Sequence, residues 1–499
     1  MTLARTNCVA LTGLIGELIT VEVDIGDGLP NFSLLGLPDA ALLESRDRVR
    51  SALINSGQIW PNRKVIVSLT PAWLPKSGSA FDLPIAIALL VASGLDFKID
   101  ETVFIGELSL DGTLRQTRGV LPGLICAHKS GIKRAIIPKA NAAEAKLIPE
   151  IETICFETIS ELLHWIETGE KFDLPILDLE IEQSPSEDFS DIAGQQNARR
   201  AAEIAAAGGH NLLMIGPPGV GKTMIAKRMP TILPPLNNEQ ALEVTAIHSI
   251  TNSDRAPLSK IAPFVAPHHT TTRVAMVGGG SHLIKPGAIS LAHHGILFID
   301  EAPECSPGIL DSLRQPLESG SISIARATGN LTFPANFILV IAANPCPCGK
   351  FVGKGRACTC TPLQVRRYLA KLSGPLLDRI DLRVKVEPVS RIELAQSGES
   401  SHVIRDRVVA ARAAAAKRFA AENWKINSQI PSRALNQKYR ATKPAMAFLH
   451  DELDRERITA RGLHKILRTS WTIADLAKKE QPDLPEVQNA YKLREGNDY

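Results

Sequence analysis

The stretch that most constrains this chain is GHNLLMIGPPGVGKTMIAKRMP, residues 209–230, in which an apolar run leads into a glycine-rich loop. The loop follows the pattern G-x-x-x-x-G-K-[ST]. Glycines let backbone N–H groups surround phosphates, and a helix that begins at the lysine adds its positive dipole end. We therefore expect Lys222 to reach the β- and γ-phosphates of ATP and the Thr223 hydroxyl to bind Mg²⁺. The residues expected to contact the nucleotide are Gly216, Pro217, Pro218, Gly219, Val220, Gly221, Lys222 and Thr223.

Length and charge restrict the class of protein only loosely. The 499 residues allow about two to four domains with separate cores. No apolar run reaches the about 18 residues that a membrane span needs, and the first residues lack the apolar segment of a signal peptide. We therefore expect a cytoplasmic protein without a membrane partner. The net charge of +3 neither indicates nor excludes a polyanionic partner.

Residues 1–172 mix the periodicities of strands and helices, which predicts a mixed α/β domain. A hairpin over 102–114 is expected to turn at Asp111 and Gly112. The remaining predicted elements are strands at 18–25, 64–69 and 134–138, and helices at 39–56, 84–93, 120–130 and 158–168.

The segments GSAFDLPIAIALL (78–90) and RGVLPGLICAHKSGIKRAIIPKAN (118–141) make this domain resemble the Lon-protease-like module of the ribosomal S5 type. Lon proteases hydrolyse peptides with a Ser–Lys pair. Ser79 stands at the serine position, but Gly123 stands where the lysine would fall. Because a serine without a base is a weak nucleophile, we expect a catalytically inactive scaffold or interaction domain rather than a protease.

The acidic, proline-containing residues 173–188 are expected to form a linker. Residues 189–389 resemble an AAA+ ATPase core with a parallel sheet. In it Ile192 to Gln195 would line the adenine pocket, and a first helix would cover 197–207.

The stretch GILFIDE (295–301) has the Walker B pattern of an apolar strand that ends in two carboxylates. Asp300 would hold Mg²⁺ and Glu301 would polarise the attacking water, since phosphoryl transfer depends on positioning and charge stabilisation. An ordinary strand with acidic residues at its end is the alternative, which the upstream P-loop disfavours.

Asn344 ends another apolar strand, at the sensor-1 position, and would also orient the water. Arg379 would act as an arginine finger on the ATP of a neighbouring subunit, which requires assembly before turnover. Alternatively, Arg379 pairs at the surface with Asp378 or Asp381. Arg461 is the sensor-2 candidate, in a C-terminal region (390–499) that is expected to form a helical lid with a polar, frayed end after residue 484.

Two insertions distinguish this ATPase from a plain P-loop domain. Residues 262–295 are long and rich in glycine, and residues 321–337 are expected to form a hairpin that turns at Thr328, Gly329 and Asn330. Both resemble the pore-facing inserts of the clade that contains MCM helicases and magnesium chelatases. The DNA-binding candidates in them are Arg273, Lys285 and Arg326, although solvated loop charges are the alternative.

Four cysteines, Cys346, Cys348, Cys358 and Cys360, fall within 346–360 as two C-x-C pairs. Four thiolates on two tight turns fit a structural Zn²⁺ site, and an iron–sulfur cluster or a metal-free loop are the alternatives. Cys8, Cys126, Cys155 and Cys305 are expected to be buried thiols. The histidine pairs His268–His269 and His293–His294 lack the spacing of metal ligands and are expected to have structural or pore-loop roles.

Nearly the whole chain resembles the magnesium-chelatase-like AAA+ ATPases of the ComM/YifB family. The motifs that carry this resemblance include GLPDAALLESRDRVRSAL (36–53), FVAPHHT (264–270), ISLAHHGILFIDE (289–301), NPCPCG (344–349) and SGPLLDRIDL (373–382). The resemblance implies a hexameric DNA motor that drives branch migration during natural transformation. Trp471 departs from the family, in which an arginine is expected before TIADLA (472–477).

Two other functions remain open at this stage. A magnesium chelatase motor subunit would share the ATPase core but would lack the Lon-like domain and the cysteine cluster. A nucleotide-switched scaffold would need ATP binding but not the complete hydrolytic set of Glu301, Asn344 and Arg379.

Overall fold

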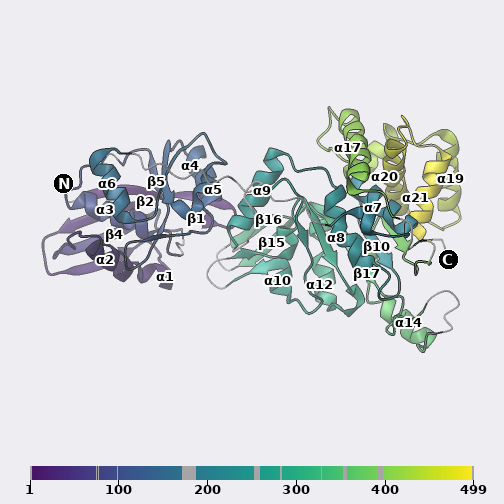
Figure 1. Cartoon of the computed structure of the whole chain (residues 1–499), viewed down its shortest axis with the longest axis horizontal. Helices are drawn as coiled ribbons and strands as arrows, with labels where there is room; N and C mark the ends of the chain where they lie inside the picture. Colours follow the sequence, from purple (N-terminus) through teal and green to yellow (C-terminus); the bar gives the residue numbers. More distant parts are fainter. Residues whose placement is uncertain are drawn as a thin grey trace.

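The computed structural model arranges the chain as three consecutive parts along its longest axis (Figure 1). The N-terminal α/β part lies at one end, the P-loop domain in the middle and the C-terminal helices at the other end. The structure describes residues 3–74, 76, 78–97, 99–170, 187–251, 259–280, 284–326, 329–351, 357–390, 393 and 397–496. Most of the predicted linker, 173–188, lies outside these residues.

The N-terminal part is built on a mixed seven-stranded sheet in the order β3-β4-β2-β1-β5-β8-β9. β1 and β2 pair antiparallel along their whole length, whereas β5, β8 and β9 run parallel. The strands are β1 Leu3–Thr12, β2 Ile15–Gly26, β3 Asn31–Leu35, β4 Lys64–Thr70, β5 Thr102–Phe104, β8 Arg134–Pro138 and β9 Glu152–Phe156, with a small pair β6 Glu107–Leu108 and β7 Leu114–Arg115. The helices are α1 Ala40–Leu43, α2 Ser45–Asn55, α3 Asp82–Ala92, α4 Val120–Lys129, η1 Lys139–Asn141, α5 Ala142–Ala145 and α6 Ile159–Thr168.

The predicted strands and most predicted helices of this part are confirmed, with two corrections. The helix expected over 39–56 is divided at Glu44 into α1 and α2. The side chain of Asp39 caps the first turn of α1, whereas α2 begins after Glu44 without a side-chain cap. The hairpin expected over 102–114 is shorter, since β5 belongs to the large sheet and only β6 and β7 pair around Asp111 and Gly112.

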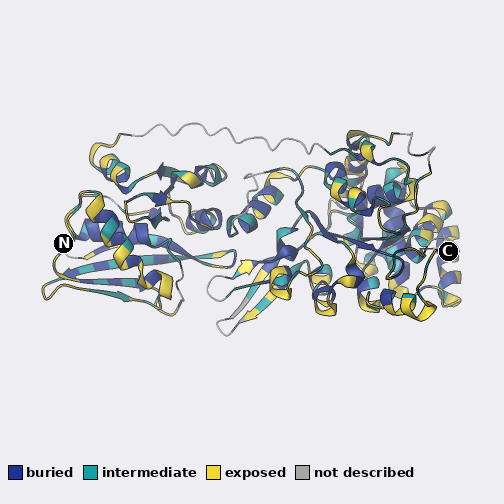
Figure 2. Cartoon of the chain, turned by 60° about the horizontal axis from the view of Figure 1, so that its bottom comes forward, coloured by how far each residue is buried: buried dark blue, intermediate teal, exposed yellow. Residues whose placement is uncertain are grey.

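The P-loop domain has a parallel five-stranded sheet in the order β11-β14-β17-β10-β18. The three central strands β14, β17 and β10 are almost wholly buried between helices, as the dark strands in Figure 2 show. The sheet strands are β10 Leu212–Ile215, β11 Phe264–Val265, β14 Ile296–Ile299, β17 Ile338–Ala343 and β18 Leu382–Lys385; two hairpins add β12 Gly278–Gly279 with β13 Lys285–Pro286, and β15 Ser321–Arg326 with β16 Gly329–Pro334. The helices are η2 Phe189–Asp191, α7 Gln196–Gly208, α8 Lys222–Ile232, α9 Asn238–Ser249, α10 Arg273–Val277, α11 Ala288–Leu291, η3 Ala302–Glu304, α12 Pro307–Ser312, α13 Pro316–Ser319, α14 Pro362–Leu369 and α15 Gly374–Leu377.

The predicted hairpin before β17 is present, but its turn is displaced. Arg326 already pairs with Gly329, so Gly329 and Asn330 belong to β16 rather than to the turn. Thr328, the remaining residue of the expected turn, lies outside the described residues.

The C-terminal helices share one hydrophobic core with the P-loop domain. Val408 of α17 and Ile466 of α20 are fully buried in the same cluster as Ile204 of α7 and Ile225 of α8. The helices are α17 Ser401–Arg418, η4 Asn427–Gln429, α18 Ser432–Gln437, α19 Lys443–Asp454, α20 Ala460–Leu476 and α21 Leu484–Glu495. The expectation of a frayed end after residue 484 is wrong, because α21 begins with a capping box at Asp483 and buries Val487 and Ala490.

Helix α9 joins the N-terminal part to the P-loop domain. Ala246 of α9 is buried in the N-terminal cluster that contains Leu124 of α4. The hydroxyl of Ser249 donates a 2.6 Å hydrogen bond to Glu144, and the backbone N–H of Gly119 donates to the carbonyl of Ser249 at 2.9 Å. In the described part of the chain, no helix is long and apolar enough to cross a membrane.

Candidate functional site

The P-loop runs from the end of β10 to the start of α8. Gly219 and Gly221 have φ values of +81° and +93°, a region that residues with a Cβ rarely adopt. Gly216 is required for a different reason, since a Cβ there would lie 2.2 Å from the carbonyl oxygen of Val386. The loop is thus shaped by its glycines for backbone contact with a ligand.

The ammonium group of Lys222 lies inside this loop. Its Nζ donates to the carbonyl oxygens of Gly216 at 2.6 Å and Pro217 at 2.8 Å, and to Oδ1 of Asn344 at 3.2 Å. Burial lowers the pKa of Lys222, and the carboxylates of Asp300 and Glu301 oppose this effect. The structure therefore brings Lys222 of the P-loop together with Asn344, the residue expected at the sensor-1 position.

Sheet register explains why residues distant in sequence meet here. β10 pairs in parallel with β17, with Ile215 opposite Ala343, so that Gly216 and Asn344 follow at the same edge. β14 pairs with the other side of β17 and delivers Asp300 to this edge. The Thr223 hydroxyl donates a 2.7 Å hydrogen bond to Oδ2 of Asp300. Hydroxyl and carboxylate oxygens of this kind are suitable ligands for Mg²⁺.

Glu301 has an uncommon backbone conformation at the end of β14. Its φ is +48°, and its backbone N–H donates to Oδ1 of Asp300 at 2.9 Å. The side chain is 50% exposed, and its Oε2 lies 3.8 Å from Nδ1 of His269. Strained backbone in non-glycine residues is concentrated at functional sites.

The predicted adenine-pocket segment packs beside the P-loop. Ile192 is buried in the cluster against which Val220 packs. Gln195, the last residue of the segment expected to line this pocket, donates through Nε2 to the carbonyls of Val220 at 3.1 Å and Glu387 at 2.6 Å. Its φ of +51° is uncommon for a residue with a Cβ.

Arg379 and Arg461 both lie close to Glu318, which belongs to α13. The guanidinium of Arg379 donates to Glu318 and, at 2.6 Å, to the carbonyl of Pro375. Arg461 lies 3.7 Å from Glu318 and 3.8 Å from Asp378. The alternative pairing of Arg379 with Asp378 or Asp381 is therefore not observed; Asp381 instead binds Lys465 at 2.5 Å.

The two insertions lie against each other. A Cβ on Gly278 of β12 would approach Ile324 of β15 to 3.0 Å. Arg273, the first residue of α10, and Lys285 in β13 are both exposed, which agrees with a DNA contact and with solvated loop charges alike. The side chain of Arg326 lies outside the described part of the structure.

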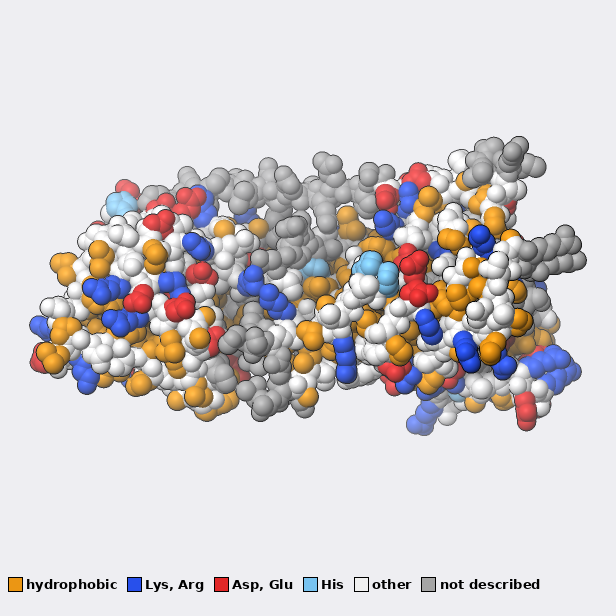
Figure 3. All heavy atoms as spheres, turned by 90° about the horizontal axis from the view of Figure 1, so that it is seen from below, with side chains coloured by type: hydrophobic (Ala, Val, Ile, Leu, Met, Phe, Trp, Pro, Cys, Tyr) orange, Lys and Arg blue, Asp and Glu red, His pale blue; other side chains and the backbone are white. Residues whose placement is uncertain are grey.

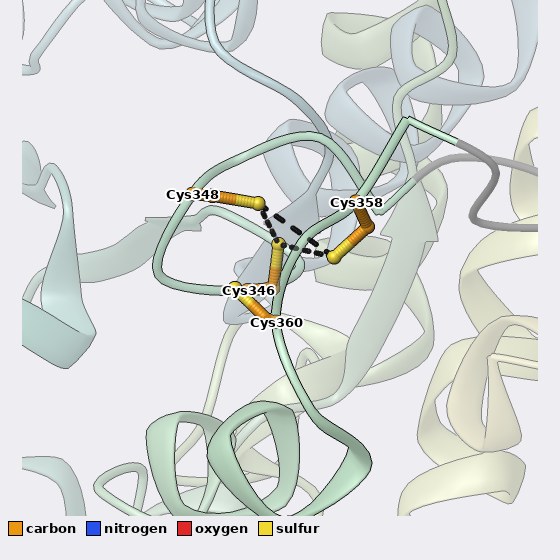
Figure 4. Close-up of side chains that lie close together, drawn as sticks. All are labelled: Cys346, Cys348, Cys358 and Cys360. Carbon is orange, nitrogen blue, oxygen red and sulfur yellow. Dashed lines mark hydrogen bonds between the residues drawn. The ribbon is translucent and has the colours of Figure 1, made fainter.

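The four clustered cysteines converge on one point (Figure 4). Sγ of Cys346 lies 3.3 Å from that of Cys348 and 3.7 Å from that of Cys358, and the Cys348–Cys358 distance is 3.6 Å. Ligand sulfurs at the corners of a zinc tetrahedron are about 3.8 Å apart, given a Zn–S bond of about 2.3 Å. Hydrogen bonds from the backbone N–H groups of Lys350 and Thr359 lower the pKa of Cys348 to about 6.

The cysteine loop also contacts the P-loop. Gly349 packs so closely on Pro218 that a Cβ would lie 2.7 Å from the proline Cδ. Asn344 precedes Cys346 by two residues, so the first part of the loop is attached to the nucleotide site. Of the other cysteines, Cys8, Cys155 and Cys305 are buried as expected, whereas Cys126 is only half-buried.

His293 and His294 form a second cluster with Glu243. Their Nε2 atoms lie 3.2 Å and 2.6 Å from Oε2 of Glu243. Nδ1 of His293 accepts a hydrogen bond from the backbone N–H of Asn336, so neutral His293 carries its proton on Nε2 and donates it to Glu243. Because that nitrogen has no free lone pair, a structural role agrees better with this geometry than a metal site.

In the N-terminal part, the hydroxyl of Ser79 donates to the carboxylate of Glu107. The ammonium of Lys76 is directed to the carbonyls of Leu69, at 2.9 Å, and Pro71. At Gly123, a Cβ would lie 2.9 Å from Ile105. None of these contacts supplies Ser79 with a lysine base.

Models of protein families match most of the chain. Residues 188–394 match the family described as magnesium chelatase, subunit ChlI. Residues 21–141 match subunit ChlI of Mg-chelatase, and residues 398–494 match the magnesium chelatase, subunit ChlI C-terminal family.

Full-length relatives agree with these matches. Competence protein ComM of Haemophilus influenzae is 40% identical over 507 residues, which cover 99% of this chain and 98% of that protein. YifB of Escherichia coli is 40% identical over 500 residues, covering 99% and 97% of the two chains. An uncharacterized protein of Mycobacterium tuberculosis is 44% identical over 500 residues, covering 99% of each chain.

A partial similarity points to a second family. Lon protease 1 of Thermus thermophilus is 30% identical over 161 residues, which cover 30% of this chain and 19% of that protein.

Proposed function

Because the chain belongs to the ComM/YifB family of magnesium-chelatase-like AAA+ ATPases, we propose that it is an ATP-driven DNA motor that catalyses branch migration. In this proposal the chain acts in the cytoplasm as a hexameric ring on single-stranded and branched DNA. It promotes homologous recombination of incoming DNA during natural transformation, in agreement with the relative named competence protein ComM. The observation that carries the ATP-driven part of the proposal is the joining of Lys222, Asn344, Thr223 and Asp300 at one edge of the sheet, and the ComM relative carries the DNA part.

ATP hydrolysis follows from the chemistry of these side chains. The P-loop amides and Lys222 bind the phosphates, and Thr223 and Asp300 hold Mg²⁺, which neutralises charge on the phosphates. Glu301 polarises the attacking water and Asn344 orients it. Ile192 lines the adenine pocket.

Arg379 is proposed to complete the site of a neighbouring subunit. Its guanidinium contacts Glu318, as Arg461 does. It does not contact the P-loop around Lys222 in the described part of the chain, which supports a role in trans. An arginine supplied in trans makes hydrolysis depend on assembly. Arg461 is proposed to act as sensor 2 on the helical lid.

DNA binding is assigned to the two adjacent insertions, through Arg273, Lys285 and Arg326. Figure 3 shows that on one face of the molecule Lys and Arg side chains are mixed with acidic ones rather than gathered into one patch. A few cations at defined positions are therefore better candidates for gripping phosphates than a general positive field.

We further propose that Cys346, Cys348, Cys358 and Cys360 hold a structural Zn²⁺. The sulfur separations and the convergence of all four thiols support this assignment over a metal-free loop. Four cysteine ligands leave no open position for catalysis. The N-terminal part is proposed to be a scaffold without protease activity, because Glu107 and not a lysine faces Ser79.

The motor proposal is tested with the full-length protein and a labelled four-way DNA junction. With ATP, the protein should convert the junction to duplex products. Arg273→Ala and Lys285→Ala should each weaken DNA binding and reduce the slope of log affinity against log salt by about one. Arg455→Ala, which removes an exposed arginine directly after α19, is the matched control and should leave DNA binding and its salt dependence unchanged. An intact junction after incubation with an active ATPase would reject the branch-migration proposal.

The family matches also favour one other function, that of a magnesium chelatase motor subunit. Hydrolysis that responds to a porphyrin and partner subunits, and not to DNA, would support it.

A further inference from the structure

The N-terminal part contacts the P-loop domain at two separate points. In Figure 1, helix α9 and the β15–β16 hairpin form the end of the P-loop domain that faces this part. The first point is Ser249, the last residue of α9: its hydroxyl donates to Glu144 at 2.6 Å, and its carbonyl accepts from the backbone N–H of Gly119 at 2.9 Å. Ala246, about one turn earlier on α9, is buried in the N-terminal cluster.

The second point is the turn between β1 and β2. A Cβ on Gly13 would lie 3.3 Å from Cζ of Phe333 in β16, so the backbone of the turn packs directly on this ring. Leu14, the next residue, packs on the cluster that contains Phe333 and also on the N-terminal cluster. The turn therefore rests on the hairpin that precedes β17.

Inside the N-terminal part, the two points are joined by backbone contacts. A Cβ on Gly119 would lie 2.2 Å from Cδ1 of Leu11, which precedes Gly13 by two residues. β2 packs on α4 in the same way, since a Cβ on Gly16 would lie 2.5 Å from Cβ of Cys126. Backbone packed this closely cannot shift without displacing its neighbours, so the N-terminal part connects α9 to β16 as a stiff body.

Both contacted elements lead to strands of the ATP site. On α9, Oε2 of Glu243 lies 3.2 Å and 2.6 Å from the Nε2 atoms of His293 and His294, which lie just before β14. Asp300 directly follows β14. On the other side, β16 is followed by β17, and Asn344 directly follows β17. A change in the position of the hairpin relative to α9 therefore affects both strands.

We propose that the N-terminal part inhibits ATP hydrolysis by its own chain. By holding α9 and the β15–β16 hairpin in one fixed relation, it restrains the adjustment of β14 and β17 around the nucleotide that precedes hydrolysis. Contact of the hairpin with DNA displaces the β1–β2 turn and releases this restraint. The release step rests on the proposed function, whereas the restraint itself requires only the ATP site.

The test uses full-length variants that each weaken one point. Ser249→Ala removes the hydroxyl bond to Glu144, which keeps its bonds to the N–H of Leu121 and the amide of Asn141 within the N-terminal part. Leu14→Ala removes the side chain that packs on both clusters. Without DNA, each variant should raise kcat about 2- to 10-fold at an unchanged KM for ATP, the factor that one intramolecular hydrogen bond contributes to an equilibrium. Because both points serve one restraint, the double variant should gain less than the product of the two single gains.

Each variant has a matched control. Ser312→Ala removes a hydroxyl bond of the same length, 2.6 Å, but to Ile309 within the P-loop domain. Leu18→Ala shortens a leucine that packs on the N-terminal cluster and, in the described part of the chain, not on the cluster of Phe333. Both controls should keep the wild-type kcat.

Amide hydrogen exchange at Gly119, whose N–H bonds to Ser249, shows whether the contact has loosened. Exchange should be faster in Ser249→Ala and Leu14→Ala than in the wild type. An unchanged or lower kcat in these variants would overturn the proposal, because the contacts would then only hold the two parts together. A higher kcat with Gly119 as protected as in the wild type would also overturn it.

Measurements with single-stranded DNA separate this inference from the proposed function. A wild-type rate that ignores DNA counts against the DNA motor, whereas a higher DNA-free kcat in the two variants still supports the restraint. With a DNA-stimulated wild type, the ratio of rates with and without DNA should fall toward one in Ser249→Ala and Leu14→Ala and stay normal in the controls. An unchanged ratio in the two variants would overturn the release of the restraint by DNA.

Discussion

The hydroxyl of Thr223 donates a 2.7 Å hydrogen bond to Oδ2 of Asp300, which joins the first turn of α8 to the end of β14. The two residues are 77 positions apart in sequence. Their contact requires that β10 and β14 flank β17 in one parallel sheet, so that their carboxyl ends meet. The contact places a hydroxyl and a carboxylate oxygen, both of kinds that bind Mg²⁺, next to each other.

Replacing Glu301 with glutamine should abolish hydrolysis while ATP binding and assembly persist. The amide keeps the shape of the side chain but polarises water poorly, and loss of a general base costs about 100-fold or more in kcat. The measurement is phosphate release at saturating ATP, together with nucleotide affinity and the mass of the assembly. Glu304→Gln, three residues further on, is the control. Normal turnover by Glu301→Gln would refute the assignment.

Arg379→Ala should bind ATP normally but hydrolyse it about 1,000-fold more slowly, since an arginine finger contributes at least that factor. If Arg379 acts in trans, mixing Arg379→Ala with Glu301→Gln subunits should restore part of the activity. In such mixed rings, some sites combine an intact Glu301 with an intact Arg379 from the neighbour. Mixtures no more active than either variant alone would place Arg379 in cis or outside the site.

One zinc per chain is expected from elemental analysis of the purified protein. Cys348→Ser combined with Cys358→Ser should lose the metal, lower the melting temperature and weaken ATP binding, because the loop that carries Gly349 packs on Pro218. Cys126→Ser, which removes a half-buried thiol outside the cluster, should retain zinc. A zinc-free wild type of full stability would contradict the assignment.

The free energy of unfolding should fall in mild acid, because unfolding exposes the buried His210, which then takes up a proton. Burial lowers the pKa of His210 to about 4. An unfolded histidine titrates near about 6.5, so between these values only the unfolded chain takes up the proton. Unfolding is therefore favoured by about 1.4 kcal/mol for each pH unit below 6.5, and this contribution is absent at higher pH.

The check on this prediction is the difference in melting temperature between pH 7.5 and pH 5.5. It should be smaller in His210→Gln than in the wild type, whereas exposed His402→Gln should leave it unchanged. Comparing variants is necessary because Asp82, whose pKa burial raises to about 6, contributes in the opposite direction. Equal differences in the wild type and His210→Gln would show that His210 is not the responsible group.

The nucleotide loop and its strands could be predicted because their signals are local. A glycine-rich loop between an apolar strand and a helix specifies its own backbone, and the apolar run before the loop forms β10, Leu212–Ile215. The cluster of Arg379 with Glu318 and the contact of His269 with Glu301 could not be predicted, since they depend on sheet order and on residues from separate segments.

Helix α21 shows how composition misled the sequence interpretation. The segment after residue 484 is polar overall, yet the capping box of Asp483 and Glu486 and the spacing of Val487 and Ala490 specify a helix with one buried face. No comparable sequence pattern indicated that α9 would pack on the N-terminal part. Ala246 is buried only because α4 of the N-terminal part packs on it, and nothing local to Ala246 reveals this.

The most direct test of the central claim is the ATPase rate of the full-length protein without DNA and with single-stranded DNA, duplex or a four-way junction, each at two salt concentrations. A DNA motor that grips phosphates should be stimulated strongly by single-stranded and branched DNA, and less so at the higher salt concentration. An ATPase rate that is the same under all these conditions would contradict the DNA-motor claim and leave only the ATP site.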